Sequence, residues 1–118
     1  MLSLPSSVRV FLCLVPVDMR RSFDGLAAVA EGVVRQSPLS GHLFVFRGRR
    51  GDRVKVLYWD RDGYALWYKR LEAGAFRFPA DTREAREITA AELGMLLEGI
   101  EVSAVKRSKR FSLFAPGA

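Results

Sequence analysis

The feature that most constrains the fold is a succession of strand-like runs separated by two glycine-containing turn signals. The runs are "HLFVF" (42–46), "RVKVLYW" (53–59) and "YALWYKRL" (64–71), which are rich in the β-branched and aromatic residues that favour strands. "RGRRGD" joins the first pair and "DRDG" the second, and glycine readily adopts the positive φ angles of such turns. Because connections this short join antiparallel neighbours, we predict an antiparallel meander of three or four strands, with "AFRFP" (75–79) as the fourth. A helix is the alternative for the third run.

A further strand is predicted near the N-terminus, with a helix after it. In "VRVFLCLVPV" (8–17) apolar residues occupy both alternating sets of positions, which is typical of a central strand. Ser22 suits a helix N-cap, and Asp24 suits the first helical turn, where the helix dipole favours an acid. Apolar residues then recur at helical spacing up to Val33, and we expect Pro38 to end this helix.

The clearest local signal is "ITAAELGMLLEGI" (88–100), which predicts a second helix. Thr89 and Glu92 have the spacing of a capping box, and Ile88 lies where a hydrophobic staple to Leu93 begins. Gly99 suits the glycine stop of a helix C-terminus. Together these elements predict a single α+β domain, an antiparallel β-sheet meander with two main helices packed on it.

Length and charge divide the chain into a body and a tail. Its 118 residues and its hydrophobic content of 49% fit one domain. The formal net charge is +6, and residues 106–110 contribute four positive charges without any acid. We therefore expect an α+β domain over residues 1–101 and a basic, mobile tail over residues 102–118. Residues 43–71 are also predominantly basic, whereas residues 81–101 are predominantly acidic.

The apolar run at residues 8–17 raises the question of a membrane or secretion signal. It contains Arg9 and Pro16, lacks a basic segment ahead of it, and is far short of the ~20 residues that a membrane span needs. Cys13 is the only cysteine, so no internal disulfide can form, which fits a reducing compartment. We expect a cytoplasmic protein without a membrane partner.

Basic side chains give the strongest functional signal. The hairpin "FRGRRGDRVK" (46–55) holds four arginines and one lysine against one aspartate. The planar guanidinium group suits phosphate, so this hairpin is either a grip for a polyanion or an ordinary solvated turn. An exposed aromatic residue nearby could stack on a base or bury itself in a partner. In the hairpin and at two other basic positions of the chain, the candidate nucleic-acid-binding residues are Arg47, Arg49, Arg50, Arg53, Lys55, Lys69, Arg70, Arg20 and Arg21.

No catalytic residue and no metal site are predicted. His42 is the only histidine, and at the start of a strand we expect a surface or hydrogen-bonded role. Cys13 is expected in the core. Asp60 and Asp62 could share a metal ion, but Asp-x-Asp-Gly is ordinary turn chemistry in which side chains cap local amides. We expect no cofactor and no small-molecule substrate.

Three long motifs occur in the order found in a family of bacterial accessory proteins. They are "LPSSVRVFLCLVPVDMRRSFDGLAAV", "GHLFVFRGRRGDRVKVLYWDRDGYALWYKRLEAGAFRFP" and "ITAAELGMLLEGI". Over roughly residues 2–101 the chain resembles the TnpB-type protein that insertion sequence sixty-six elements encode beside their transposase. That protein is unrelated to the RNA-guided nucleases that share the TnpB label. The chain departs from the family pattern in four places: the part of the helix that follows Ala28, the residues Ala75 and Arg77, and the tail.

The resemblance implies a non-enzymatic accessory role in DNA transposition, with DNA, the transposase of the same element, or both as partners. It implies no catalytic residues. Two alternatives remain open. One is a pure protein–protein adaptor that uses exposed aromatics or the acidic helix near Glu92 and Glu98, and the other is a metal-dependent nuclease that uses Asp60 and Asp62.

The basic tail generates a first prediction. Deleting residues 104–118 should weaken binding to all DNA sequences about equally, because contacts to phosphate carry no sequence information, and should barely shift the melting temperature. Fluorescence anisotropy on several duplexes and thermal unfolding measure the two effects. A large loss of thermal stability would show instead that Phe111, Leu113 and Phe114 dock on the core.

Overall fold

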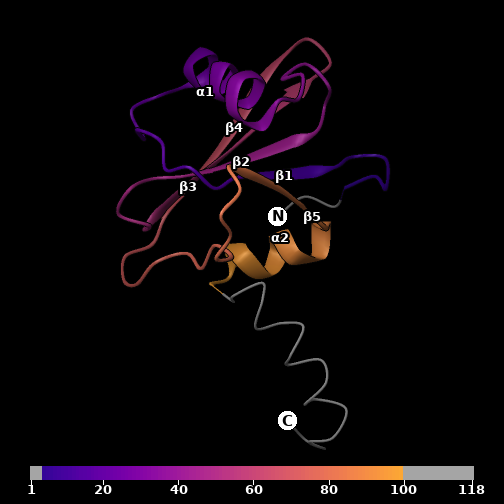
Figure 1. Ribbon diagram of the computed structural model, residues 1–118. Coiled ribbons are helices and arrows are strands. Elements are labelled where there is room, and N and C mark those ends of the chain that lie inside the picture. The colour runs from indigo at the N-terminus through magenta and orange to yellow at the C-terminus, as the bar shows by residue number, and fades with distance from the viewer. Residues whose placement is uncertain (1–3, 100–118) are drawn as a thin grey trace, which may run out of the picture.

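A computed structural model describes residues 4–99 of the chain. These residues form a five-stranded sheet in the order β4-β3-β2-β1-β5, with helices on both faces (Figure 1). The strands are β1 (Val10–Cys13), β2 (Leu43–Arg47), β3 (Arg53–Asp60), β4 (Gly63–Arg70) and β5 (Ala85–Ile88). The helices are α1 (Phe23–Val29), which continues into a π-helical turn η1 (Ala30–Val34), and α2 (Ala90–Leu97). The α+β fold class is confirmed.

The predicted meander is formed by β2, β3 and β4, which are three consecutive antiparallel strands. Because β4 is a strand throughout, the helical alternative for this run is wrong. The fourth strand expected at residues 75–79 is also wrong, since residues 71–84 have no regular secondary structure. Here the chain crosses the tip of the β2–β3 hairpin, where the Phe76 N–H donates to the Gly51 carbonyl at 2.8 Å. Pro79 has no N–H to offer to a ladder.

The sheet is mixed and not wholly antiparallel, because β1 runs parallel to β2. The central position predicted for the N-terminal strand is confirmed, since β1 lies between β2 and β5. The parallel pairing becomes possible because α1 and η1 carry the chain back across one face before β2 begins. Strand β5 pairs antiparallel with β1 and was not predicted. It has only four residues, two of them charged, and therefore shows no hydrophobic period.

Alternate residues of the strands pack under different helices. One set faces α2 and forms a core with its apolar stripe; it includes Val10, Leu12, Val45, Val54, Val56, Leu93, Leu96 and Leu97. The other set faces α1 and η1 and includes Phe11, Cys13, Phe44, Phe46, Leu57, Leu26 and Ala30. Cys13 is therefore a core residue, as predicted. Because both faces of the central strands are covered, their side chains are shielded from water, which is the main driving force for this packing.

The helix ends agree with the sequence only in part. Ser22 precedes α1, but its side chain makes no capping hydrogen bond. The helix ends at Val34, four residues before the predicted Pro38, because Arg35 adopts a left-handed conformation with φ of 61°. For α2 the capping box of Thr89 and Glu92 is confirmed by reciprocal hydrogen bonds of 3.1 and 3.0 Å. Gly99 has φ of 83°, and its N–H donates to the carbonyl of Leu96.

Some expectations concern residues that the structure does not describe. The predicted domain boundary at residues 101–102 and the basic tail lie outside residues 4–99. Within the described range, no helix has the length and apolar character needed to cross a bilayer.

Candidate nucleic-acid interface

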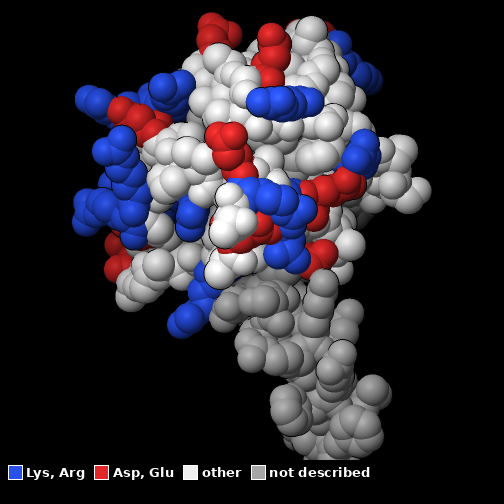
Figure 2. Space-filling view, in the orientation of Figure 1, with Lys and Arg blue, Asp and Glu red and all other residues white. Residues whose placement is uncertain are grey.

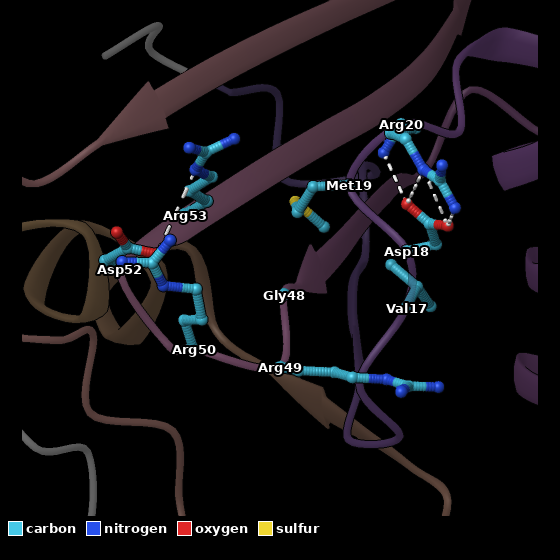
Figure 3. Close-up of a pocket in the computed structure, with 9 residues that line it drawn as sticks. All are labelled: Val17, Asp18, Met19, Arg20, Gly48, Arg49, Arg50, Asp52 and Arg53. Atoms are coloured by element: carbon cyan, nitrogen blue, oxygen red, sulfur yellow. Dashed lines mark hydrogen bonds and ion pairs between the residues drawn. The ribbon is translucent and has the colours of Figure 1, made fainter.

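A hollow of about 430 Å³ lies between the tip of the β2–β3 hairpin and the connection from β1 to α1 (Figure 3). Its walls come from two segments, 17–20 and 48–53. The two segments are joined by backbone hydrogen bonding, since the Val17 N–H donates to the Arg47 carbonyl at 2.9 Å. Val17 and Gly48 form a short parallel bridge at the same place. The hollow is therefore formed by the main chain as well as by its side chains.

Gly48 lies close to Met19 of the other segment. A Cβ atom at this position would lie 2.7 Å from the Cγ atom of Met19, whose side chain points toward Gly48 in Figure 3. The hairpin tip is closed by a hydrogen bond from the Gly51 N–H to the Gly48 carbonyl, and Gly51 has φ of 78°. The two glycines of the motif thus have different roles. Gly51 provides the positive φ of the turn, and Gly48 leaves room for the Met19 side chain.

Lys55 fixes the β1–α1 connection to the sheet. Its side chain is buried, and its Nζ atom donates to the carbonyl oxygens of Met19 and Arg21, each at 2.7 Å. The ammonium also lies over the ring of Tyr68, 4.8 Å from the ring centroid. Burial of a charge is costly unless hydrogen bonds satisfy it, and here the two carbonyls and the ring do so. Lys55 was a candidate for DNA contact, but in this conformation it is a structural residue beneath the surface.

Arg49 and Arg50, at the hairpin tip, are the exposed candidates of the hollow that have no carboxylate partner among residues 4–99. Both side chains are exposed, and neither forms an ion pair with any residue between 4 and 99. Figure 3 shows Arg49 extending away from the other labelled side chains. Guanidinium groups without a carboxylate partner keep all their donors for an incoming anion.

Two other arginines of the hollow are held by carboxylates. Arg20 forms a bidentate pair with Asp18, with a shortest distance of 2.6 Å between Nη2 and Oδ2. Hydrogen bonds from the Arg20 side chain lower the pKa of the Asp18 carboxyl well below its ordinary value. Arg53 lies 4.0 Å from Asp52 and donates to the Tyr68 hydroxyl at 3.2 Å. These contacts orient the two guanidinium groups and partly neutralise them.

The other candidates divide between the two faces of the sheet. Arg47 lies toward the α2 side, where it donates to the Leu14 carbonyl at 2.7 Å and covers the Phe78 ring. Lys69 also lies on that side, with Nζ 3.3 Å from the Leu97 carbonyl at the end of α2. Arg70 is exposed and paired with Glu72 at 3.1 Å. Arg21 is exposed and belongs to the connection that Lys55 holds.

The surface view relates these positions to one another. In Figure 2 lysine and arginine side chains gather on the left-hand side of the molecule, where the hairpin tip and the β1–α1 connection lie in Figure 1. Acidic side chains are interspersed among them, as the pairs formed by Asp18 and Asp52 require. The structure therefore brings together Arg20, Arg49, Arg50 and Arg53 but not Arg47 or Lys69. We call Arg20, Arg49, Arg50 and Arg53 the arginine cluster.

The residues considered for catalysis occupy ordinary structural positions. His42 accepts a hydrogen bond from the Arg9 N–H at 3.0 Å, in line with the hydrogen-bonded role expected for it. The predicted turn between β3 and β4 is confirmed, and Asp60 and Asp62 are exposed there. The predicted capping is wrong, since within residues 4–99 neither carboxylate accepts a hydrogen bond from a backbone amide. The turn instead depends on Arg61, whose φ is 52°. Within residues 4–99, no three His, Cys, Asp or Glu side chains are placed to hold a metal ion.

Sequence reasoning missed Asp18 and Met19 as parts of the site. When only charge is considered, an acidic residue argues against a polyanion-binding site, so Asp18 was not predicted as part of one. Its spacing of two from Arg20 was the available clue, because an aspartate can accept from both the backbone and the side chain of the second residue after it.

Comparison with known proteins decides the family. The family model described as "IS66 Orf2 like protein" matches residues 8–107. The chain belongs to this family.

Two similar proteins come from Sinorhizobium fredii. One, "Uncharacterized protein y4jC", is 37% identical over 100 residues, which is 85% of this chain and 86% of the relative. The other, "Uncharacterized protein y4hO", is 43% identical over 100 residues, covering 83% of this chain and 87% of the relative. No solved structure matches the chain. The resemblance found in the sequence is thereby confirmed, and family membership implies an accessory role associated with transposition.

Lys55 provides a prediction for this IS66 Orf2 like protein. Replacing it with Met should lower the free energy of unfolding by roughly 2–4 kcal/mol, because two carbonyl oxygens lose a charged donor while the aliphatic stem is retained. Urea unfolding measures the change. Lys69→Met is the matched control, and since Lys69 is exposed its effect should stay below about 1 kcal/mol. Equal effects of the two substitutions would contradict a structural role for Lys55.

Proposed function

We propose that this protein is a non-enzymatic accessory factor that binds the DNA backbone during transposition of its insertion element. The arginine cluster is the proposed contact, with Arg21 and Arg70 at its margin. Binding of the transposase from the same element is part of the proposal. The family supports the transposition-associated role, and the chemistry of the cluster supports DNA as the ligand.

The observation that carries the proposal is that the two arginines at the hairpin tip form no ion pair with a described residue. Most other charged groups in this region have a partner within 4.0 Å, but Arg49 and Arg50 have none among the described residues. Each of these guanidinium groups can form two parallel hydrogen bonds to a pair of phosphate oxygens. Binding then gains from release of the counterions that surround DNA.

The surroundings of the tip favour DNA over a flexible acidic peptide. Hydrogen bonds from Val17, Gly51, Leu71 and Phe76 fix the backbone on several sides of the tip. Arg20 and Arg53 are held in place by Asp18 and Asp52 and flank the same hollow. A fixed hairpin backbone and two oriented guanidinium groups suit a rigid ligand with regularly spaced charges, because these groups lose little freedom on binding.

The adaptor alternative has one observation in its favour. Tyr68 is a large aromatic side chain with 48% of its surface exposed, and it lies beside Arg53. Aromatic and arginine residues are enriched in protein interfaces, so the same neighbourhood could bind the transposase without DNA. A pull-down with the transposase, with and without nuclease treatment, separates direct contact from a bridge through DNA.

The hairpin tip gives a direct test of DNA binding. Replacing Arg49 and Arg50 with Ala should leave folding intact, since exposed substitutions usually cost under ~0.5 kcal/mol. Affinity for duplex DNA should fall roughly tenfold at low salt, and the slope of log K against log[salt] should decrease by about 0.9 for each lost phosphate contact. Fluorescence anisotropy over a salt series measures both quantities.

A matched control removes the same charge elsewhere. Arg35 and Arg61 are exposed and adopt left-handed backbone conformations, which Asn tolerates. Arg61 follows the last residue of β3, whereas Arg53 is its first residue, so Arg61 lies far from the hairpin tip. The double substitution Arg35→Asn/Arg61→Asn therefore tests how much affinity depends on the net charge of the protein alone. It should change affinity and slope much less than the tip variant. Equal losses in the two variants would point to net charge alone, and unchanged binding in the tip variant would remove the hairpin from the site.

We also predict that the protein does not cleave DNA. Hydrolysis of a phosphodiester with metal ions needs acids that converge on the metal, and Asp60 and Asp62 are solvated turn residues. Supercoiled DNA incubated with purified protein and Mg²⁺ or Mn²⁺ should remain supercoiled. Nicking that is lost in Asp60→Asn or Asp62→Asn protein would establish the nuclease alternative instead.

A further inference from the structure

Strand β4 ends the sheet at the edge away from β1 and has one described neighbour, β3 (Figure 1). The two strands are joined by a two-residue turn, so the flanking residues Asp60 and Gly63 exchange hydrogen bonds. Because hydrogen-bonded positions alternate along a ladder, odd-numbered residues of β4 bond to β3. The same alternation continues past the strand, where the Leu71 N–H donates to the Asp52 carbonyl at 2.8 Å.

The even-numbered residues therefore direct their N–H and C=O groups away from the sheet. They are Tyr64, Leu66, Tyr68 and Arg70, and none of them has another backbone partner within residues 4–99. Four donors and four acceptors thus form an open ladder along the strand. Water satisfies them in the monomer, but a second strand could do so equally well.

The usual protections of an edge strand are weak here. Strand β4 has eight residues without proline, and its pairing with β3 runs through eight consecutive residues without a bulge. Its first six residues carry no charge, and only Lys69 and Arg70 at its end do. The opposite edge differs, since β5 has four residues, two of them charged. A long, regular, largely uncharged edge favours pairing with another chain.

We propose that β4 pairs antiparallel with β4 of a second copy of this chain, with Leu66 on the two-fold axis. In that register outward-facing residues meet outward-facing residues, as an antiparallel ladder requires. Tyr64 lies opposite Tyr68 of the second copy, and Asp62 lies opposite Arg70. On the other face Ala65 meets Trp67, a small residue against a large one. The proposal is independent of DNA binding.

Charge favours this register over the one centred on Trp67. Moving the two-fold axis to Trp67 keeps the ladder pattern but places Asp62 opposite Glu72, two like charges at each end of the interface. With the axis at Leu66, each end instead joins the acid of the β3–β4 turn to the basic end of the other strand. The strand begins beside acids and ends in bases, and antiparallel pairing brings the two ends together. A strand from another protein would have no reason to match this pattern.

A charge exchange tests the proposal on the full-length protein. Sedimentation equilibrium from micromolar to submillimolar concentration should show a monomer–dimer equilibrium. Asp62→Lys and Arg70→Glu, both at exposed positions, should each weaken self-association about fivefold at low salt, because attraction at both ends becomes repulsion. The double variant Asp62→Lys/Arg70→Glu should recover the affinity of the wild type. Failure of the double variant to recover it would overturn this register.

Disulfide trapping gives a second readout. Leu66→Cys should form a cross-linked dimer under mild oxidation, because facing residues of a hydrogen-bonded pair have Cα atoms about 5.5 Å apart. Trp67→Cys should not cross-link, and the native Cys13 is buried and remains inert. Cross-linking through Trp67→Cys alone would overturn the register centred on Leu66 and assign the one centred on Trp67. A wild-type protein that stays monomeric at all of these concentrations would overturn self-association. Protection of the β4 edge from hydrogen exchange only after the transposase is added would overturn it as well.

Discussion

The buried ammonium group of Lys55 is the interaction on which the arrangement of the basic surface depends. Strand β3 would otherwise present a charged side chain to a region that the β1–α1 connection covers. By donating to two carbonyls of that connection, Lys55 satisfies its own charge and holds residues 19–21 above the sheet. Arg20 consequently lies across the hollow from Arg49 and Arg50, although they are distant in sequence. The lysine acts on this surface through the main chain, from a buried position beneath it.

Acidic residues within this basic region have a positive role. Asp18 and Asp52 reduce the net charge near the hairpin tip, but they also fix the directions of Arg20 and Arg53. The result is a surface that combines two oriented, partly neutralised guanidinium groups with two that have no carboxylate partner among residues 4–99. The net charge of the chain, which is raised by the basic residues near the C-terminus, would not distinguish the arginine cluster from other parts of the surface.

Local signals allowed most of the fold to be predicted, and long-range packing accounts for most of what was missed. The capping box of Thr89 and Glu92 and the two hairpin turns involve neighbours in sequence, so residue type and spacing were sufficient. The β5 strand depends on the backbone of β1 more than on its own side chains, and its "AREI" sequence has no period to detect. The segment 75–79 has strand-like residues but packs singly across a hairpin tip. In the site, the cluster of arginines was visible in the sequence, whereas the burial of Lys55 depends on carbonyls thirty-four and thirty-six residues away.

The position of β1 has a consequence for how the chain is made. Although β1 is among the first segments to leave the ribosome, it lies between β2 and β5, and β5 begins only at Ala85. The sheet therefore cannot be completed until nearly all of the described chain has been synthesised, and β1 must wait with one edge open. Pairings that span so much sequence form slowly, because the intervening chain has to be ordered first. A transcript or protein cut short before this point would yield a chain with a bare hydrophobic strand at its centre, which is a substrate for chaperones and proteases and not a shorter working version of the protein.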